Sequence, residues 1–177
     1  MTVNKIHFCI IFLFPFTVHS KPVHYSFNTH WQIKAPLEKV WNIINDAGDW
    51  PLWWKGFEQA TILDNGNEDG IGQLIHYTVK SFLPFTLSFN SKITAKEKFK
   101  RITSLATGDL EGIGEWTFEE SNGITHVHYK WDIVSNKKIF NLLSPGLKWF
   151  FKYNHNLIMH WGAKKLAKKL HAKLIEG

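Results

Sequence analysis

The chain has 177 residues, which is enough for one domain with its own buried core and too few for a second domain of ordinary size. Aromatic residues make up 15% of the sequence, more than a compact core of this length needs, so some aromatic surface is free to line a cavity. The formal net charge of +6 comes mainly from lysines within residues 164–173, and no basic stripe recurs elsewhere, so we do not infer nucleic-acid binding.

The first twenty residues differ in character from the rest of the chain. Lys5 precedes an apolar run over residues 6–18, and this segment ends in Val18-His19-Ser20. A charged start, a short apolar run and a small final residue are typical of a secretory signal peptide, and the run is too short for a comfortable membrane span. We therefore expect residues 1–20 to be a signal peptide and the protein to be exported, either periplasmic or secreted. The alternative is a start codon assigned too far upstream and a cytoplasmic protein.

Several chemistries find no support in the remaining residues, 21–177. The single cysteine, Cys9, lies in the apolar run, so the domain has no thiolate nucleophile, disulfide or cysteine metal ligand. The zinc-protease pattern HExxH, the hydrolase pattern GxSxG, a phosphate-binding loop and a dinucleotide-binding glycine motif are also missing from the sequence. We therefore expect no cofactor and no metal.

The domain is predicted to begin with a strand and two short helices. Residues 25–34 alternate between apolar and polar side chains, which is the pattern of a half-buried strand. Pro36 then opens a segment with apolar residues at helical spacing, and Gly48 ends it. Asp49 can cap a second helical turn over residues 50–54.

The middle of the chain is predicted to form an antiparallel meander. Runs rich in β-branched and aromatic residues are separated by turn-forming pairs such as Asn65-Gly66 and Asn122-Gly123. Because these separators are short, consecutive strands should pair as hairpins. Six strands are expected, over residues 57–63, 71–80, 85–97, 101–108, 113–120 and 124–134.

The last part of the chain changes to a helical period. Apolar residues fall on one helical face after the start signal Ser144-Pro145, and the pattern continues through Leu166, Leu170 and Leu174. The predicted helix has about 28 residues and a length of roughly 40 Å. A helix this long must pack on something extended, and a curved sheet of seven strands is the only predicted partner.

This order of elements and several local segments resemble a known superfamily. The segments that carry the resemblance are residues 35–41 (APLEKVW), 49–54 (DWPLWW), 70–72 (GIG), 108–112 (GDLEG) and 154–155 (NH). They resemble the polyketide cyclase/dehydrase and lipid-transport branch of the START-like (SRPBCC) superfamily, over about residues 24–172. The resemblance implies an α+β helix-grip fold, in which a curved antiparallel sheet encloses a cavity against the C-terminal helix. It does not choose between carriers, receptors and enzymes, because fold does not dictate chemistry.

The candidate ligand-binding residues lie on the faces that would point into this cavity. Aromatic residues in phase on the strands could bind a flat or apolar ligand by burial and ring stacking, or could simply fill the core. Asn154 stands on the apolar face of the long helix, where a buried amide needs partners. It either bonds to strand backbone or orients a ligand. The predicted ligand-binding set is Trp31, Tyr77, Phe89, Trp116, Tyr129, Trp131, Phe150, Asn154 and Ile158.

Three residues are weak candidates for catalysis. His155 lies about 100° around the helix from Asn154, at the edge of the apolar face, and could be a general base only if it reaches the cavity. Otherwise it is a rim histidine exposed to water. Asp109 and Glu111 flank Leu110 in a turn and would guard the cavity mouth if it opened there, although turn carboxylates are usually solvated.

A histidine row is expected on the opposite, convex face of the sheet. His126 and His128 share one face of the last predicted strand, and His30 on the first strand could approach them if the two strands pair. Three imidazoles could hold zinc. Because this face lies away from the cavity, we expect an exposed row without a metal.

Three functions remain open from the sequence. The first is binding or transport of a small hydrophobic molecule, such as a lipid, an isoprenoid or a polyketide-like compound. The second is a cyclase or dehydrase-type enzyme, in which the cavity folds a reactive chain and one acid or base assists. The third is a partner-binding or weakly membrane-binding module, with Leu166, Leu170 and Leu174 opposite a lysine face that meets an anionic surface. We favour binding, because no isolated titratable group is expected to point inward. The sequence does not indicate an oligomeric state.

Overall fold

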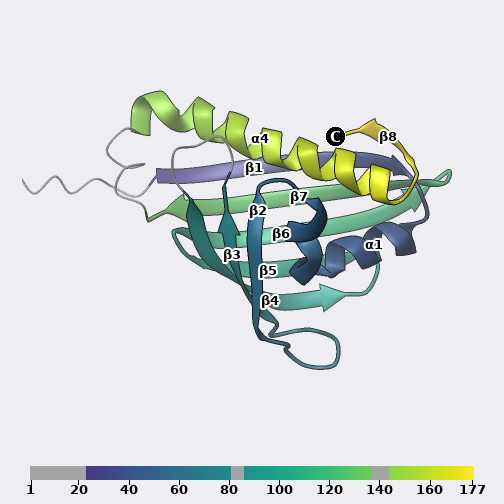
Figure 1. The fold of residues 1–177 in the computed structure, drawn as a ribbon, viewed down its shortest axis with the longest axis horizontal. Helices are drawn as coiled ribbons and strands as arrows, with labels where there is room; N and C mark the ends of the chain where they lie inside the picture. Colours follow the sequence, from purple (N-terminus) through teal and green to yellow (C-terminus); the bar gives the residue numbers. More distant parts are fainter. Residues whose placement is uncertain (1–22, 81–85, 137–143) are drawn as a thin grey trace, which may run out of the picture.

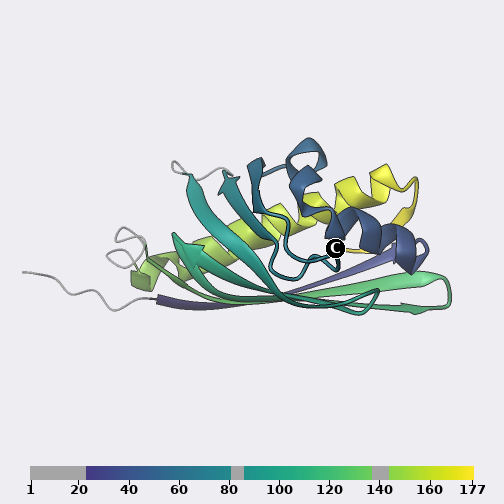
Figure 2. The same cartoon turned by 90° about the horizontal axis from the view of Figure 1, so that it is seen from below.

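The fold is one curved antiparallel sheet closed around a long helix. The computed structural model describes residues 23–80, 86–136 and 144–177, so the predicted signal peptide lies outside the described residues. The sheet has eight strands in the order β2-β3-β4-β5-β6-β7-β1-β8, and α4 lies along β1 (Figure 1). In the view turned by 90°, the strands bend around the helix (Figure 2). The strands are β1 (Val23–Lys34), β2 (Phe57–Asp64), β3 (Leu74–Val79), β4 (Leu87–Glu97), β5 (Arg101–Gly108), β6 (Leu110–Ser121), β7 (Ile124–Ser135) and β8 (Lys173–Glu176).

The predicted helix-grip fold is confirmed, with shifts at the ends of elements. Strand β6 starts at Leu110, three residues earlier than predicted, because the turn ends at Asp109. The six meander strands pair consecutively and antiparallel, as their short separators indicated. The first and seventh strands also pair along their whole length, which brings the start of the domain next to its last predicted strand.

Two short helices follow β1. They are α1 (Leu37–Asn45) and α2 (Trp50–Trp53), joined by a single 3₁₀ turn (Ala47–Asp49). Helix α1 packs on β6 and β7, and α2 packs on β2 and α4. Trp54, immediately after α2, is almost fully buried, and its indole Nε1 donates a hydrogen bond to the Ile158 carbonyl of α4 at 2.8 Å. The indole lies against Gly162, where an added Cβ would come within 2.6 Å of ring atoms Cζ2 and Nε1. A glycine on α4 therefore makes the space that Trp54 occupies.

The C-terminal end of the chain differs from the prediction. Helix α4 (Ser144–Lys169) ends five residues before Leu174, and the chain then forms β8, so the sheet has eight strands instead of seven. The end of α4 has the Schellman pattern, because Ala172 N–H bonds to the Ala167 carbonyl and His171 N–H to that of Lys168. His171 adopts a positive φ of 51°, the conformation that glycine usually supplies. The glycine that usually marks the end of a helix in a sequence is therefore missing here.

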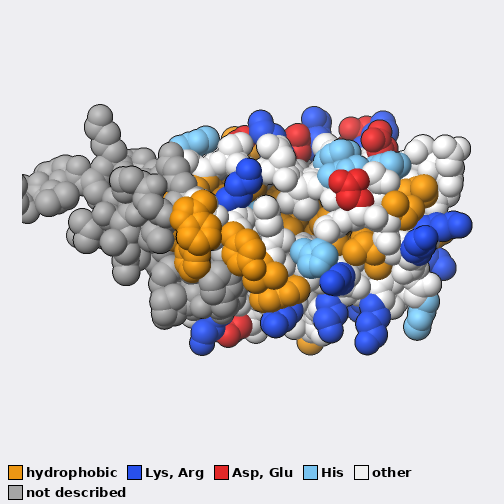
Figure 3. Space-filling model, turned by 90° about the horizontal axis from the view of Figure 1, so that it is seen from above, with side chains coloured by type: hydrophobic (Ala, Val, Ile, Leu, Met, Phe, Trp, Pro, Cys, Tyr) orange, Lys and Arg blue, Asp and Glu red, His pale blue; other side chains and the backbone are white. Residues whose placement is uncertain are grey.

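The C-terminal leucines pack inward and do not form a free apolar face. Leu166 has no exposed area, and Leu170 and Leu174 pack against the core. This corrects the arrangement on which the membrane hypothesis depended, because no leucine stripe remains opposite the lysines. Figure 3 looks down on the edge formed by α4, where a group of apolar side chains is exposed next to the grey residues and Lys and Arg are spread around the rest of the view. Within the described residues, no helix has the length and apolar character needed to cross a membrane.

The histidine row lies on the convex face as predicted. His30 faces His128 across the β1–β7 pair, and their rings stack with centroids 4.2 Å apart. His126 Nδ1 lies 3.4 Å from His30 Nε2, and His30 Nδ1 lies 3.3 Å from a carboxylate oxygen of Glu176 on β8. Among the side chains that the structure describes, no group of three or more His, Cys, Asp or Glu is arranged to hold a metal ion.

Candidate ligand cavity

A cavity of about 120 Å³ lies between the concave face of the sheet and the N-terminal half of α4. Its wall comes from β1, α2, all six meander strands and α4. Most of the lining side chains are aromatic or aliphatic, and the lining residues within the described ranges include no Asp, Glu, Lys or Arg. Such a wall favours uncharged, apolar molecules, because a buried charge without a partner is costly.

Seven of the nine predicted ligand-binding residues line this cavity, namely Tyr77, Phe89, Trp116, Tyr129, Trp131, Asn154 and Ile158. The structure does not place the other two in the wall. Trp31 has no exposed area and packs between Trp54 and Trp116, with ring centroids 5.4 and 5.6 Å away. Phe150 packs edge-on against Phe151, which does line the cavity. Trp31 therefore belongs to the core behind the wall, because its ring is covered on both sides.

Asp109 and Glu111 are not among the described residues that line the cavity, and their candidate role as guards of its mouth stays a prediction. The Asp109 carboxylate accepts a hydrogen bond from Ser88 N–H at 2.8 Å, and the Asp109 N–H donates to the Ser88 carbonyl. It therefore joins the β5–β6 turn to β4. Glu111 is exposed and borders a shallow groove with Lys130 and Asp132, outside the cavity.

His155 reaches the interior and is not a rim residue. Its side chain is 7% exposed and lines the cavity, and its ring stacks on Phe27 at 4.2 Å with an interplanar angle of 13°. The sequence placed it at an edge because the apolar stripe looked narrow. In the structure α4 packs against both β1 and α2, so its buried side extends further around the helix.

The two nitrogens of the His155 ring have no hydrogen-bond partner. Burial lowers the pKa of His155 to about 4, and the nearby Asn156 side chain opposes this shift without reaching hydrogen-bonding geometry. The imidazole is therefore neutral at pH 7, with one donor and one acceptor nitrogen. By contrast, the buried Asn154 already has an interaction within the protein.

Two tyrosines bring neutral hydroxyl groups to the opposite wall. Tyr77 stacks on Trp50 at 5.5 Å and Tyr129 on Trp116 at 4.1 Å. Burial raises the pKa of both phenols well above the ordinary value, and for Tyr77 the neighbouring Tyr129 adds to the effect. Gly114 leaves room there, since an added Cβ would lie 2.8 Å from the Tyr129 hydroxyl and 3.3 Å from Ser104 Oγ.

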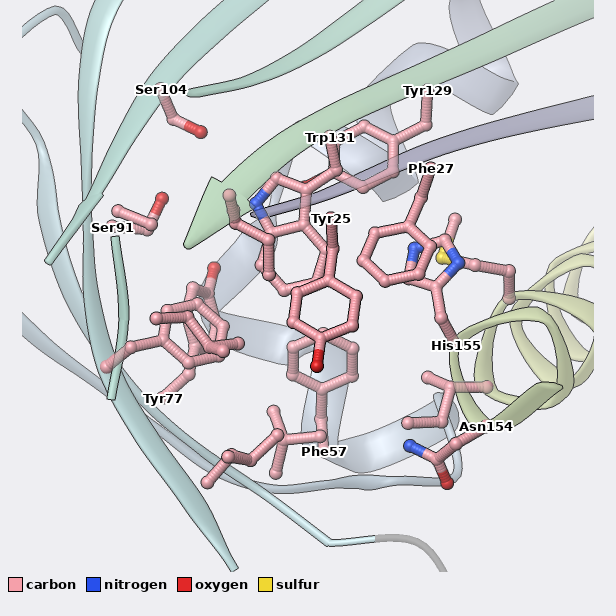
Figure 4. A pocket seen from close by; sticks show the side chains of 18 of the residues that line it. Tyr25, Phe27, Phe57, Tyr77, Ser91, Ser104, Tyr129, Trp131, Asn154 and His155 are labelled. Atoms are coloured by element: carbon pink, nitrogen blue, oxygen red, sulfur yellow. The ribbon is translucent and has the colours of Figure 1, made fainter. Parts of the chain in front are cut away.

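Several residues of the wall are not among those predicted from the sequence. Ser91 and Ser104 approach from the strands on one side, while His155 and Asn154 come from α4 on the other (Figure 4). The two serines share strand faces with buried apolar residues, so their phase was a usable signal. Tyr25 and Phe27 have the same phase as Trp31 on β1, and both line the cavity. The Tyr25 hydroxyl is also buried without a hydrogen-bond partner.

The fold and the cavity define a helix-grip protein with a largely apolar, preformed internal site. The sequence comparison agrees, since the model of the family described as polyketide cyclase / dehydrase and lipid transport matches residues 33–155, more than half of the chain. This chain belongs to that family. No curated protein is similar enough in sequence to count as a match.

Solved structures with the same fold include both enzymes and proteins without a stated activity. The Zhui aromatase/cyclase from Streptomyces sp. R1128 is 14% identical with a TM-score of 0.69, over 84% of this chain and 94% of that one. A START superfamily protein from Mycobacterium smegmatis is 15% identical with a TM-score of 0.66, over 84% and 98%. The di-domain aromatase/cyclase BexL is 17% identical with a TM-score of 0.67, over 85% of this chain and only 51% of BexL. At these identities the likeness shows the fold alone.

Proposed function

We propose that this protein binds and carries a small hydrophobic molecule in the cavity between the sheet and α4. The observation that supports this function is the composition of the wall, in which rings such as Trp116, Tyr129 and Trp131 surround an open space. Aromatic walls with a few polar groups are typical of small-molecule sites. Membership of a family named partly for lipid transport agrees with this function.

The size of the cavity favours a compact ligand over a long lipid. The volume of about 120 Å³ is of the order of a cavity that admits benzene, roughly 150 Å³. Drug-sized ligands need roughly 300 Å³ or more. Among a lipid, an isoprenoid and a polyketide-like aromatic, we therefore favour a flat molecule of one or two rings, which would stack on the wall.

A cyclase or dehydrase activity receives less support from the lining residues. A general base works best when its pKa lies near the working pH, and burial holds the pKa of His155 at about 4. Burial also keeps the Tyr77 and Tyr129 phenols protonated. His155, Tyr77 and Tyr129 are therefore all neutral at pH 7, which suits binding more than proton transfer.

Titration with naphthalene, followed by tryptophan fluorescence, tests the binding function. Four lining tryptophans report on the site, namely Trp50, Trp54, Trp116 and Trp131. Ala106→Phe would fill the cavity and should weaken binding at least about tenfold, while Thr107→Phe adds the same ring at the next, exposed position of β5 and should bind like wild type. Circular dichroism checks that both variants fold. Equal affinity in all three proteins, or no saturable binding, would refute the function.

We also propose export, on the sequence pattern of residues 1–20 alone. N-terminal sequencing of the native protein from separated cell fractions tests it. A chain that starts near Lys21 outside the cytoplasm would support export, and an intact Met1 in the cytoplasm would rule it out.

A further inference from the structure

Among the described side chains that line the cavity, His155 has two buried polar atoms without a hydrogen-bond partner. Most buried polar side chains have a hydrogen-bond partner, and leaving one unpaired costs about 1–3 kcal/mol. His155 is more than nine-tenths buried, lines the cavity and has no partner at either ring nitrogen. A molecule that enters the cavity is therefore the partner to test for at this site.

The stacking of His155 fixes the direction of those nitrogens. Its ring lies nearly parallel to Phe27 at 4.2 Å, and Trp131 lies 5.7 Å away. Phe27 thus covers one face of the ring, and hydrogen bonds to the two nitrogens form in the plane of the imidazole. A hydroxyl or carbonyl oxygen that reaches the ring edge would pair with one nitrogen without disturbing the stack.

The surroundings select against a charged group at this place. The lining residues in the described ranges include no lysine or arginine that could neutralise a carboxylate, and no carboxylate that could neutralise an amine. An ion would lose its hydration without gaining a counter-charge. A neutral imidazole can instead donate to a carbonyl or accept from a hydroxyl.

Given the proposed binding function, on which this inference rests, we propose that the ligand is uncharged and oxygenated, and that its hydroxyl or carbonyl oxygen hydrogen-bonds to the ring edge of His155. The ligand class is then a neutral phenol, alcohol or ketone on a small ring system. Fatty acids and other carboxylates are excluded from the class because of their charge, although most of their length is apolar. The competing occupant of the same place is a resident water molecule.

Three probes of one shape test this inference at pH 7, namely naphthalene, 2-naphthol and 2-naphthoate. We expect 2-naphthol to bind roughly three- to tenfold more tightly than naphthalene, as one net hydrogen bond provides. The naphthoate should bind at least about tenfold more weakly than 2-naphthol, because its charge finds no partner. Equal binding of naphthol and naphthalene would overturn the inference in favour of water, and the tightest binding by naphthoate would overturn the neutral class.

Two variants assign the hydrogen bond to His155. His155→Phe retains a ring to stack on Phe27, so naphthalene should still bind while the preference for 2-naphthol disappears or reverses. Tyr25→Phe removes the Tyr25 hydroxyl, which also has no partner and belongs to a residue of the wall, and should keep the preference. Loss of the preference in Tyr25→Phe alone would overturn the assignment. If His155→Phe does not fold, a shift of the His155 ring nitrogen resonances in wild type with 2-naphthol, but not with naphthalene, decides the same question. Failure of naphthalene itself to bind refutes the proposed function instead.

Discussion

The two halves of α4 meet the rest of the molecule in different ways. In the half after Met159, which we call the packed half, Ala163 and Leu166 have no exposed area and Gly162 lies directly against the Trp54 indole. In the half before Met159, the hollow half, Asn154, His155 and Ile158 border an open cavity.

Side-chain size explains much of the difference. Helices and their neighbours approach more closely where the side chains at the contact are small, and the packed half has Gly162, Ala163 and Ala167. The hollow half has larger side chains and two buried polar groups, His155 and Asn154. The same helix thus holds the fold together at one end and supplies a binding wall at the other. The packed half should therefore govern stability, and the hollow half should govern ligand binding and pH response.

The largest expected effect is that of Gly162→Ala in the packed half. The new methyl group would overlap a rigid indole, so we expect the free energy of unfolding to fall by about 3 kcal/mol. Urea denaturation measures this change. The matched test is a double-mutant cycle with Trp54→Leu, in which Gly162→Ala should cost much less once the indole is removed. A cost below about 1 kcal/mol in the wild-type background would show that the packed half can shift to accept the methyl group and is not closely packed.

The next effect is a loss of stability in acid that arises in the hollow half. The pKa of His155 is about 4 in the folded protein and 6.5 in the unfolded chain, so the unfolded chain binds more protons between these values. The free energy of unfolding should therefore fall as the pH is lowered from 6.5 toward 4, by about 2–3 kcal/mol between pH 7 and 4.5.

His155→Phe is the control for this pH effect. Urea denaturation at pH 7 and pH 4.5 should show a smaller acid loss in the variant by about the same 2–3 kcal/mol. The other titrating groups, including His128 and the carboxylates, are present in both proteins and cancel in the comparison. The same acid loss in both proteins would mean that His155 is protonated without cost and is not isolated from water.

A smaller effect is expected from Asn154→Leu. Because Asn154 already has an interaction within the protein, the variant should lose about 1–2 kcal/mol of stability and keep its relative affinities for naphthalene and 2-naphthol. Thermal denaturation and the fluorescence titration measure the two outcomes. A variant that is fully stable but no longer distinguishes the two probes would instead assign the ligand-orienting role to Asn154.

The smallest effect is expected where β8 closes the packed half. Glu176 lies 3.3 Å from His30 and accepts a hydrogen bond from the Gln32 side-chain amide at 2.7 Å, but its own side chain is about half exposed. Glu176→Gln should therefore lower the free energy of unfolding by no more than about 0.5–1 kcal/mol. A loss comparable to that of Gly162→Ala would show that surface charges, and not close packing, hold this end together.

The sequence predicted elements better than it predicted their ends. Strand and helix periods identified β1 and the start of α4 because each depends on neighbours along the chain. The end of α4 was missed because His171, and not glycine, adopts the positive φ of the Schellman turn. Strand β8 was not predicted for the same reason, because the predicted helix extended through Leu174 and so covered the start of this strand.

By itself, the sequence determined the fold class, the largely apolar character of the site and five of the strand residues that line it, because alternation along a strand fixes which face each side chain occupies. These five are Tyr77, Phe89, Trp116, Tyr129 and Trp131. Only the tertiary structure decided the polar part of the site. Whether His155 is a rim residue or a buried neutral imidazole depends on where β1 and α2 lie around α4. Whether Trp31 is wall or core depends likewise on the rings of Trp54 and Trp116 that cover it. These contacts join residues far apart in the chain, and no local period encodes them.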